Sequence, residues 1–297
     1  MNASALAEAL ASPHSPRLLH VLPAEHFAAA HIAGAVNACI YETAFLEKVR
    51  ALAPDPALPI VVYGEGAPSL DSEEAATTLR AAGYTDVSDF RGGLREWRAA
   101  ALPVLGHGAL PVPPVPDGRY LADPATSVIR WTGRNLFNHH HGRIPLAEGA
   151  VEWRRGSLIA ATFAIDLREI VCEDLADAGY NAMLIRHLHS PDFFDIERHP
   201  TARFEMTRAE AIPTATEGTP NFAIAGPFTL RGVTREITFP ATIAAADADH
   251  LTAQAVLEID RTQWGSHYGS GRFFAFLGPH VVNDHILLHL KIHATRA

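Results

Sequence analysis

Histidine is the residue type with the greatest capacity for chemistry in this chain, and it is unevenly distributed. Of the 17 histidines, 13 follow residue 105. The densest group is the run His139–His141, and neutral imidazole is a common ligand of zinc and other transition metals. Side chains alternate along an extended segment, so we expect His140 to point away from its two neighbours. A zinc site needs three or four converging ligands, and the sequence groups no such set, so we expect no metal.

Two cysteines and one serine are the remaining candidates for a nucleophile. Cys39 and Cys172 are too few for a disulfide scaffold or a cysteine-based zinc site. Cys39 is expected to be a small buried residue, as free cysteines commonly are. Ser69 lies in a loop that supplies no base to activate its hydroxyl. No nucleophile, base and acid occur at a recognisable spacing, so we expect a protein that is not an enzyme.

The composition is that of a globular protein, and the length of 297 residues favours two domains. Hydrophobic residues make up 48% of the chain and charged residues 19%. The net charge of −9 is shared by both parts of the chain, and neither has the positive field that binding to DNA or RNA requires. No apolar run is long enough to span a membrane, and no signal-peptide pattern opens the chain, so we expect a cytoplasmic protein without a transmembrane segment.

Prolines between residues 103 and 118 divide the chain, because they cannot continue a helix or a strand ladder. On this basis we assign residues 1–105 to a first domain, 106–118 to a Pro-rich linker and 119–297 to a second domain. In the first domain, apolar runs alternate with helical patterns, at residues 17–22, 24–30, 45–52, 60–63 and 71–82. This order predicts an α/β domain with a parallel sheet and helices on both faces.

After the linker the hydrophobic period changes to two, which is typical of β-strands. The alternating apolar positions are Ile159, Ala161, Phe163, Ile165 and Leu167 in one strand, Leu251, Ala253, Ala255, Leu257 and Ile259 in a second, and Val282, Ile286, Leu288, Leu290 and Ile292 in a third. Further strands are expected near residues 127–134, 146–153, 201–207, 222–230 and 233–243. These about eight strands predict an all-β domain that closes into an antiparallel barrel.

Five landmarks in the first domain resemble the rhodanese-like family in order and spacing. They are Pro23–Phe27, His31–Asn37, Ile60–Tyr63, Ala81–Val87 and Gly92–Trp97. Members of that family that transfer sulfur place a cysteine directly after the strand that corresponds to residues 60–63. Here that position is Gly64, and Glu65 and Asp71 make the loop acidic, so neither sulfur transfer nor anion binding is expected. The resemblance implies a catalytically inactive rhodanese-like module for interaction or regulation.

Three stretches in the second domain resemble the YceI-like family of lipocalin-like barrels. They are Asp123–Trp131, His187–Phe204 with its Asp-Phe-Phe-Asp element, and Gly226–Thr234. The resemblance spans about residues 119–296 and implies a barrel that binds a polyisoprenoid or another long amphiphilic chain. The segment Tyr268–Phe274 is similar to a subgroup that also carries a histidine near residue 141. These landmarks suggest that His141, His187 and Tyr268 form a polar cluster, which either hydrogen-bonds within the protein or offers hydrogen bonds to a polar head group.

Small inward side chains independently favour a ligand in such a barrel. Eight strands enclose space for packed side chains or for one slender ligand, and Ala161, Ala253 and Ala255 leave an apolar slot. Each CH₂ group buried there contributes about 0.8 kcal/mol, so a long tail binds without polar contacts. The expected ligand-binding residues are Ala161, Phe163, Ile165, His141, His187, Phe193, Phe194, Phe204, Phe228, Ala253, Ala255, Trp264, Tyr268 and Phe274.

The leading hypothesis is a non-catalytic protein that binds a long-chain amphiphile of polyisoprenoid, quinone or fatty-acid type, with no other cofactor. Two alternatives stay open at this point. In the first, His141, His187 and Tyr268 act as an enzyme on a substrate in the barrel. In the second, phenylalanine side chains fill the barrel and both domains are scaffolds. We also expect a homodimer, because barrels of this type expose an edge strand and hairpins and many soluble proteins form two-fold assemblies.

We predict that the protein lacks thiosulfate sulfurtransferase activity, because Gly64 offers no nucleophile. The measurement is turnover of thiosulfate to thiocyanate, with an active sulfurtransferase as the positive control. Turnover together with a persulfide trapped on Cys39 or Cys172 would contradict the prediction. Gly64→Cys alone is not expected to create activity, because the acidic loop would raise the pKa of the new thiol.

Overall fold

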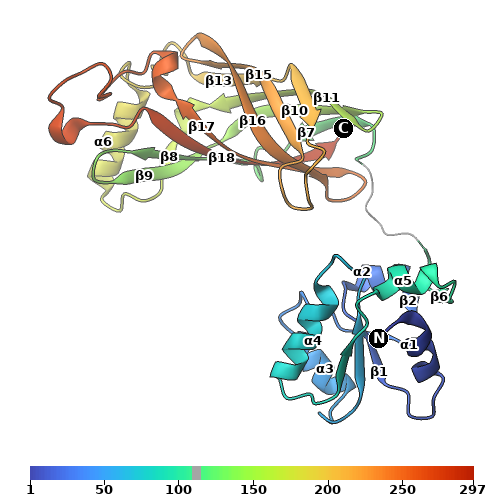
Figure 1. Ribbon diagram of the computed structural model, residues 1–297. Coiled ribbons are helices and arrows are strands. Elements are labelled where there is room, and N and C mark those ends of the chain that lie inside the picture. Colours follow the sequence, from blue (N-terminus) through green and yellow to red (C-terminus); the bar gives the residue numbers. More distant parts are fainter. Residues whose placement is uncertain (109–114) are drawn as a thin grey trace. The chain divides into compact units, whose positions relative to one another are not determined.

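The computed structural model describes residues 1–108 and 115–297 and divides the chain into two compact units (Figure 1). The first unit is Met1–Val112 and the second is Pro113–Ala297. The last strand of the first unit ends at Leu105, and the first strand of the second begins at Gly118. Residues 106–117 of the expected linker lie between these strands, residue 118 is the first of β7, and residues 109–114 lie outside the described residues.

The first unit has the predicted α/β fold. Its sheet has the strand order β3-β1-β4-β5, and every neighbouring pair is parallel. The strands are β1 (Arg17–His20), β3 (Val36–Asn37), β4 (Ile60–Tyr63) and β5 (Val87–Asp89), and β2 (His31–Ile32) pairs separately with β6 (Val104–Leu105). Because parallel strands are joined by helical crossovers, such a sheet is covered on both faces.

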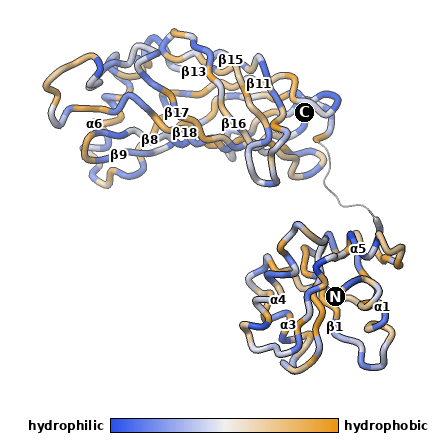
Figure 2. Tube along the Cα trace, viewed as in Figure 1, coloured by the Kyte–Doolittle hydropathy of each residue, from blue (hydrophilic) through white to orange (hydrophobic). Residues whose placement is uncertain are grey.

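Successive residues of a strand point to opposite faces of the sheet, and helices pack against the apolar side chains on each face. The helices are α1 (Ala3–Leu10), α2 (Ala24–Ala29), α3 (Phe45–Leu52), α4 (Asp71–Ala81) and α5 (Gly93–Ala99). Val62 of β4 belongs to one core cluster with Leu79 of α4, whereas its neighbour Val61 belongs to another with Leu6 of α1. Figure 2 shows the hydrophobic strand β1 among helices that carry hydrophilic residues.

Eight strands of the second unit close into the predicted antiparallel barrel. The ring runs β18-β17-β16-β15-β13-β11-β10-β7 and closes where β7 pairs with β18. Its strands are β7 (Gly118–Ala122), β10 (Leu146–Arg154), β11 (Ser157–Asp166), β13 (Thr201–Glu205), β15 (Phe222–Leu230), β16 (Val233–Ala245), β17 (His250–Asp260) and β18 (His285–Arg296). The ring encloses the main hydrophobic core of this unit.

Two barrel strands are interrupted, and the sequence did not show this. β7 and β8 (Val128–Arg134) both pair with β18, and the Asp123 carboxylate holds the turn between them by accepting bonds from Ala125 and Thr126. Pro145 likewise separates β10 from β9 (His139–Ile144), because proline lacks an N–H group for the ladder. The strand expected near residues 127–134 is therefore the second half of an interrupted strand, and its first half, β7, was missed.

A β-bulge changes which residues of β11 face the interior. Glu152 pairs with Ala160, but the next residue, Trp153, pairs with Leu158. Ile159 is therefore the extra residue of the bulge, and it is 44% exposed, whereas Leu158 is buried in the core. The prediction that Ile159 faces inward was wrong for this reason.

Helix α6 (Ala178–His189) lies near the end of the barrel that carries β9 and was not predicted (Figure 1). The Asp177 side chain caps it by accepting a bond from the amide of Tyr180. The remaining elements are the 3₁₀ turns η1 (Leu167–Glu169), η2 (Arg261–Trp264) and η3 (Gly278–His280) and the strands β12 (Val171–Cys172) and β14 (Arg208–Ala211). Among the described residues, no helix has the length and apolar character needed to cross a membrane.

The buried side chain of His20 predicts a pH-dependent stability of the first unit. It lies between the rings of Phe27 and Tyr63, and burial, followed by the nearby His31 and His26, lowers its pKa from 6.5 to about 4. Between pH 6.5 and about pH 4, the His20 side chain therefore binds a proton in the unfolded state but not in the folded state. We expect the free energy of unfolding of this unit to fall by about 2 kcal/mol between pH 7 and pH 5.

Native-state hydrogen exchange of the β1 and β4 amides at the two pH values measures this change. His20→Gln should remove most of the pH dependence, because the glutamine side chain does not titrate. His14→Gln is the matched control, since His14 is exposed. A pH dependence that survives in His20→Gln would show that other groups cause it.

Candidate functional site

The inward-facing side chains of the barrel strands enclose an apolar chamber, called here the inner chamber. The chamber encloses about 110 Å³, and the surface that its wall exposes to the cavity is entirely apolar. Ala161, Ala253 and Ala255 line it at positions where larger side chains would fill the space. The chamber therefore suits an apolar group and offers no partner to a polar one.

A larger outer chamber adjoins the inner one toward α6 and the loop of residues 265–284, between η2 and β18. It encloses about 480 Å³, which is within the range of small-molecule sites. Its wall includes residues of α6 and of the 265–284 loop, together with several polar side chains. The two chambers meet at shared wall residues, which are Ile129, Ile165, Phe228, Ile259 and Leu288.

Most of the residues expected to bind a ligand line these chambers. Those in the wall of the inner chamber are Ala161, Phe163, Ile165, Phe204, Phe228, Ala253 and Ala255. Those in the wall of the outer chamber are Ile165, His187, Phe193, Phe194, Phe228 and Tyr268. The alternation of apolar residues and the motif around residue 193 therefore located the cavity wall correctly.

Three of the expected residues lie away from both chambers. His141 stacks on His139 with ring centroids 5.9 Å apart, and it is His140 that lines the outer chamber, as the alternation along β9 requires. The placement of His141 at the cavity is corrected accordingly. Trp264 is buried behind the wall and donates its indole N–H to a backbone carbonyl of β15 over 3.1 Å. Phe274 is 51% exposed in the 265–284 loop.

His187, Phe193 and Tyr268 form an aromatic cluster at the wall of the outer chamber. The rings of His187 and Tyr268 meet edge to face with centroids 4.5 Å apart, and the His187 and Phe193 centroids are 4.9 Å apart. Nε2 of His187 lies 3.2 Å from a carboxylate oxygen of Asp192. Two of the three residues expected to form a polar cluster, His187 and Tyr268, are thus in contact, and the phenol and imidazole place hydrogen-bonding groups in a mainly apolar wall.

Arg261 of η2 fixes the 265–284 loop at the border of the outer chamber. Its side chain is buried and donates to the backbone carbonyls of Ser266, Val282 and Asn283 over 2.8 to 3.0 Å. Its guanidinium carbon lies 5.6 Å from the centre of the Phe193 ring. Burial lowers the pKa of Arg261, and nearby carboxylates oppose that shift. Sequence reasoning missed this residue, because a single buried arginine forms no local pattern.

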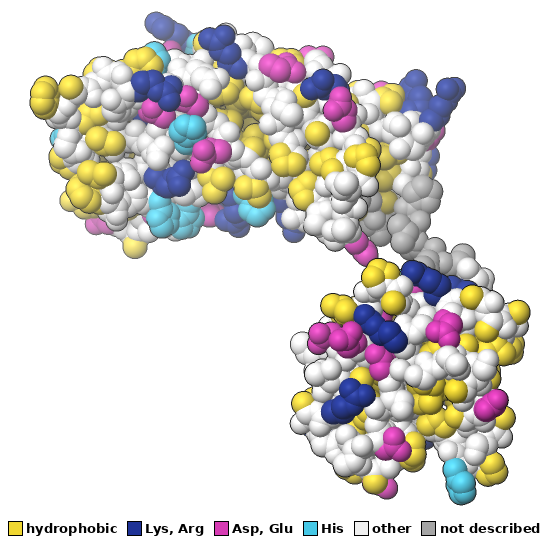
Figure 3. Space-filling model, viewed as in Figure 1, with side chains coloured by type: hydrophobic (Ala, Val, Ile, Leu, Met, Phe, Trp, Pro, Cys, Tyr) yellow, Lys and Arg dark blue, Asp and Glu magenta, His cyan; other side chains and the backbone are white. Residues whose placement is uncertain are grey.

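Large hydrophobic side chains are exposed around the same end of the barrel. Figure 3 shows hydrophobic side chains at the end of the second unit where Figure 1 places α6 and the 265–284 loop. The exposed members in these segments and in the β8–β9 turn are Leu136, Phe137, Tyr180, Met183, Tyr268, Phe273, Phe274 and Phe276. Exposed apolar surface of this kind typically marks a site of ligand entry or of interaction.

In the first unit, a carboxylate occupies the space beside Gly64. Asp71, the first residue of α4, is buried and accepts hydrogen bonds from the Ser69 hydroxyl and the Ser72 amide over 2.9 and 2.7 Å. A Cβ atom added at Gly64 would lie 2.4 Å from Cγ of Asp71. A side chain at position 64 therefore requires the Asp71 carboxylate to move. Cys39, the cysteine of this unit, is buried as expected.

The three hydrogen bonds from Arg261 to backbone carbonyls predict how its loss affects the stability of the second unit. Arg261→Ala removes the donors to three backbone carbonyls and the 3.6 Å ion pair with Asp284, so we expect the free energy of unfolding to fall by about 3 kcal/mol or more. Arg272→Ala is the matched control, because Arg272 is half exposed and should cost less than about 1 kcal/mol. Urea unfolding of both variants measures the difference. Equal losses would mean that the buried hydrogen bonds do not hold this end of the barrel.

Comparisons with known proteins agree with the two units. Residues 2–100 match the family model described as a rhodanese-like domain, and residues 120–294 match that of the YceI-like domain. A UPF0312 protein of Pseudomonas putida (strain W619) is 30% identical over 123 residues, which are 41% of this chain and 58% of that protein. The chain thus spans little more than half the length of this curated relative.

Two solved structures each match more than half of this chain. BcnA of Burkholderia cenocepacia has a TM-score of 0.46 and 21% identity over 58% of this chain and 98% of its own. A polyisoprenoid binding domain from Saccharophagus degradans, implicated in plant cell wall breakdown, has a TM-score of 0.46 and 12% identity over 61% of this chain and 100% of its own. The YceI-like match covers more than half of the chain, and so this chain, which also carries a rhodanese-like domain, belongs to the YceI-like family.

Proposed function

We propose that the second unit binds one amphiphilic molecule with a long apolar tail. The observation that carries this proposal is the pair of adjoining chambers, of which the inner exposes only apolar surface and the outer also presents polar groups. The tail occupies the inner chamber, and the polar end lies in the outer one. A polyisoprenoid, a quinone or a fatty acid has the required form.

Desolvation favours this orientation over the reverse. A head group in the inner chamber would lose its water and find no hydrogen-bond partner there, which costs several kcal/mol. A tail in the same place gains about 0.8 kcal/mol for each CH₂ group removed from water. The larger outer chamber, with His187 and Tyr268 in its wall, offers donors to the head group.

The exposed hydrophobic side chains at the end of the barrel indicate where the ligand enters. Phe137 and Phe276 are 72% and 104% exposed, and they lie in the β8–β9 turn and in the 265–284 loop. A bridge between Asn135 and Val282 joins these two segments, and both residues line the outer chamber. A ligand that enters between α6 and this loop would pass these exposed apolar side chains before it reaches the outer chamber.

We propose a non-catalytic role for the first unit, in interaction or regulation. Gly64 offers no nucleophile, and the neighbouring space holds the Asp71 carboxylate. In the barrel, His187 contacts the ring of Tyr268 edge to face and pairs with the half-exposed Asp192, and this arrangement identifies no substrate or reaction, so the enzymatic alternative is not the one proposed. The scaffold alternative needs a filled barrel, and the two chambers argue against it. The homodimer and the cytoplasmic location stay predictions.

Filling the inner chamber should prevent binding. Ala253→Phe places a ring in the volume that the tail would occupy, so we expect it to abolish binding of a fluorescent fatty acid while costing the fold less than about 3 kcal/mol. The matched control is Val256→Phe on the same strand, because Val256 is 51% exposed and lines neither chamber. Fluorescence titration measures binding, and urea unfolding measures stability.

The loss of binding free energy in a head-group variant is expected to be smaller than that in Ala253→Phe, and this difference separates head-group binding from tail binding. His187→Ala should weaken binding by only about 1 to 2 kcal/mol, the scale of one hydrogen bond. Probe binding that survives in Ala253→Phe would place the tail outside the inner chamber. No binding in the parent protein, together with unfolding of Ala253→Phe, would favour a packed interior and the scaffold alternative.

A further inference from the structure

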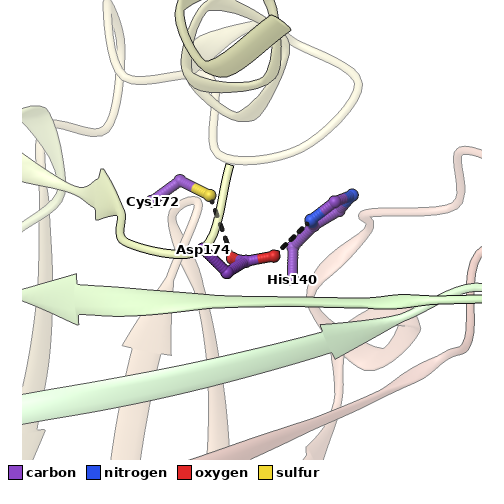
Figure 4. Close-up of side chains that lie close together, drawn as sticks. All are labelled: His140, Cys172 and Asp174. Carbon is purple, nitrogen blue, oxygen red and sulfur yellow. Dashed lines mark hydrogen bonds and ion pairs between the residues drawn. The ribbon is translucent and has the colours of Figure 1, made fainter. Parts of the chain in front are cut away.

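Three side chains with metal-binding atoms converge beside the outer chamber, and binding of a lipid tail does not explain them. They are His140 of β9, Cys172 of β12 and Asp174 of the loop before α6 (Figure 4). One nitrogen, sulfur or oxygen atom from each lies within 4.8 Å of the other two. His140 also lines the outer chamber, so the group lies at its wall.

Close backbone pairing of β9 and β12 brings these residues together. Cys172 pairs with Gly142, and a Cβ atom on Gly142 would lie 1.8 Å from the carbonyl oxygen of Val171. Only glycine therefore allows β12 to approach β9 this closely. The side chain of Asn181 in α6 then holds the loop by donating to the carbonyls of Cys172 and Leu175 over 3.0 and 3.1 Å.

The distances suit a tetrahedral metal ion. Sγ of Cys172 lies 3.2 Å from Oδ1 of Asp174, and Nδ1 of His140 lies 2.8 Å from Oδ2 of the same carboxylate. Ligand atoms of tetrahedral zinc are about 3.3 to 3.8 Å apart, given metal–ligand distances of about 2.0 to 2.3 Å. The two hydrogen-bond distances are somewhat shorter than this range, and all three donor atoms lie within 4.8 Å of one another, so the three side chains are close enough to share one ion.

The contacts of Asp174 also involve metal-binding groups. Its carboxylate accepts hydrogen bonds from the His141 amide over 2.8 Å and from the Cys172 thiol over 3.2 Å, and it lies 2.8 Å from Nδ1 of His140. Two of these neighbours are thus an imidazole and a thiol. Both are groups that bind a metal once they carry no proton on the ligand atom.

We propose that His140, Cys172 and Asp174 form a zinc site at the wall of the outer chamber, with water as the fourth ligand. Thiolate and imidazole select zinc over magnesium and calcium, which prefer oxygen ligands. Binding replaces the thiol proton of Cys172, which passes to solvent, so no redox step is involved. The proposal is independent of the lipid, because none of the three residues has to contact a ligand in the cavity.

Cobalt(II) is the probe, because it takes the place of zinc and reports its ligands by absorption. The full-length protein is reduced, freed of metal with a chelator and titrated with cobalt without any lipid. We expect one cobalt ion per chain, a thiolate-to-cobalt charge-transfer band in the near ultraviolet, and loss of both signals when zinc is added. Absence of stoichiometric binding, or binding without the charge-transfer band, would overturn the proposal.

Variants identify the ligands. Cys172→Ser should lose the charge-transfer band, and His140→Asn and Asp174→Asn should weaken cobalt binding by about 100-fold or more. Cys39→Ser and His139→Asn are the matched controls, because they remove the other cysteine and the adjacent histidine. Both should bind like the parent.

Circular dichroism of each metal-free variant checks that it folds. If Cys172→Ser is unfolded, the cobalt titration of His140→Asn tests the proposal instead, because His140 lies on β9 and is only partly buried. Parent-like binding by His140→Asn, or loss of the band in Cys39→Ser, would place the metal elsewhere.

Discussion

The ring of eight strands fixes the width of the barrel interior, and the candidate site depends on how side chains use that width. Strand number and stagger determine the diameter, so the size of the inward side chains decides whether the interior is full. Ala161, Ala253 and Ala255 contribute only methyl groups to the inner wall, while Phe204 and Phe228 keep that wall continuous. The cavity is therefore a property of a few inward positions and not of the ring itself.

Much of the fold could be predicted because both units follow simple periodicities. Buried strands alternate with helical patterns in the first unit, and the period of two in β11, β17 and β18 marks the barrel. Periodicity does not record interruptions, however. The turn held by Asp123 and the break at Pro145 each split one strand into two, and an extra residue at Ile159 reverses the facing of its neighbours without changing composition. Such features depend on pairing with a partner strand.

The candidate site was predictable where its residues lie on regular strands or in a distinctive motif, and obscure elsewhere. The inward alanines and Phe193 were found in this way. Arg261 was missed because its partners are backbone carbonyls, which every sequence contains. Cys172 was missed as a neighbour of His140 because β12 reaches β9 only through close pairing at Gly142. The spacing of residues along the sequence does not predict contacts of this kind, because they form only in the folded chain.

The Asp71 carboxylate beside Gly64 acts as an internal ligand of its own loop. It is attached to the chain a few residues away, so dilution does not reduce its effective concentration, which for short tethers is on the order of millimolar or higher. A free anion can enter only by displacing this tethered competitor and its two hydrogen bonds. The same geometry couples position 64 to the conformation of Asp71. A side chain at position 64 would displace the Asp71 carboxylate and so break the two hydrogen bonds that the carboxylate accepts from Ser69 and Ser72.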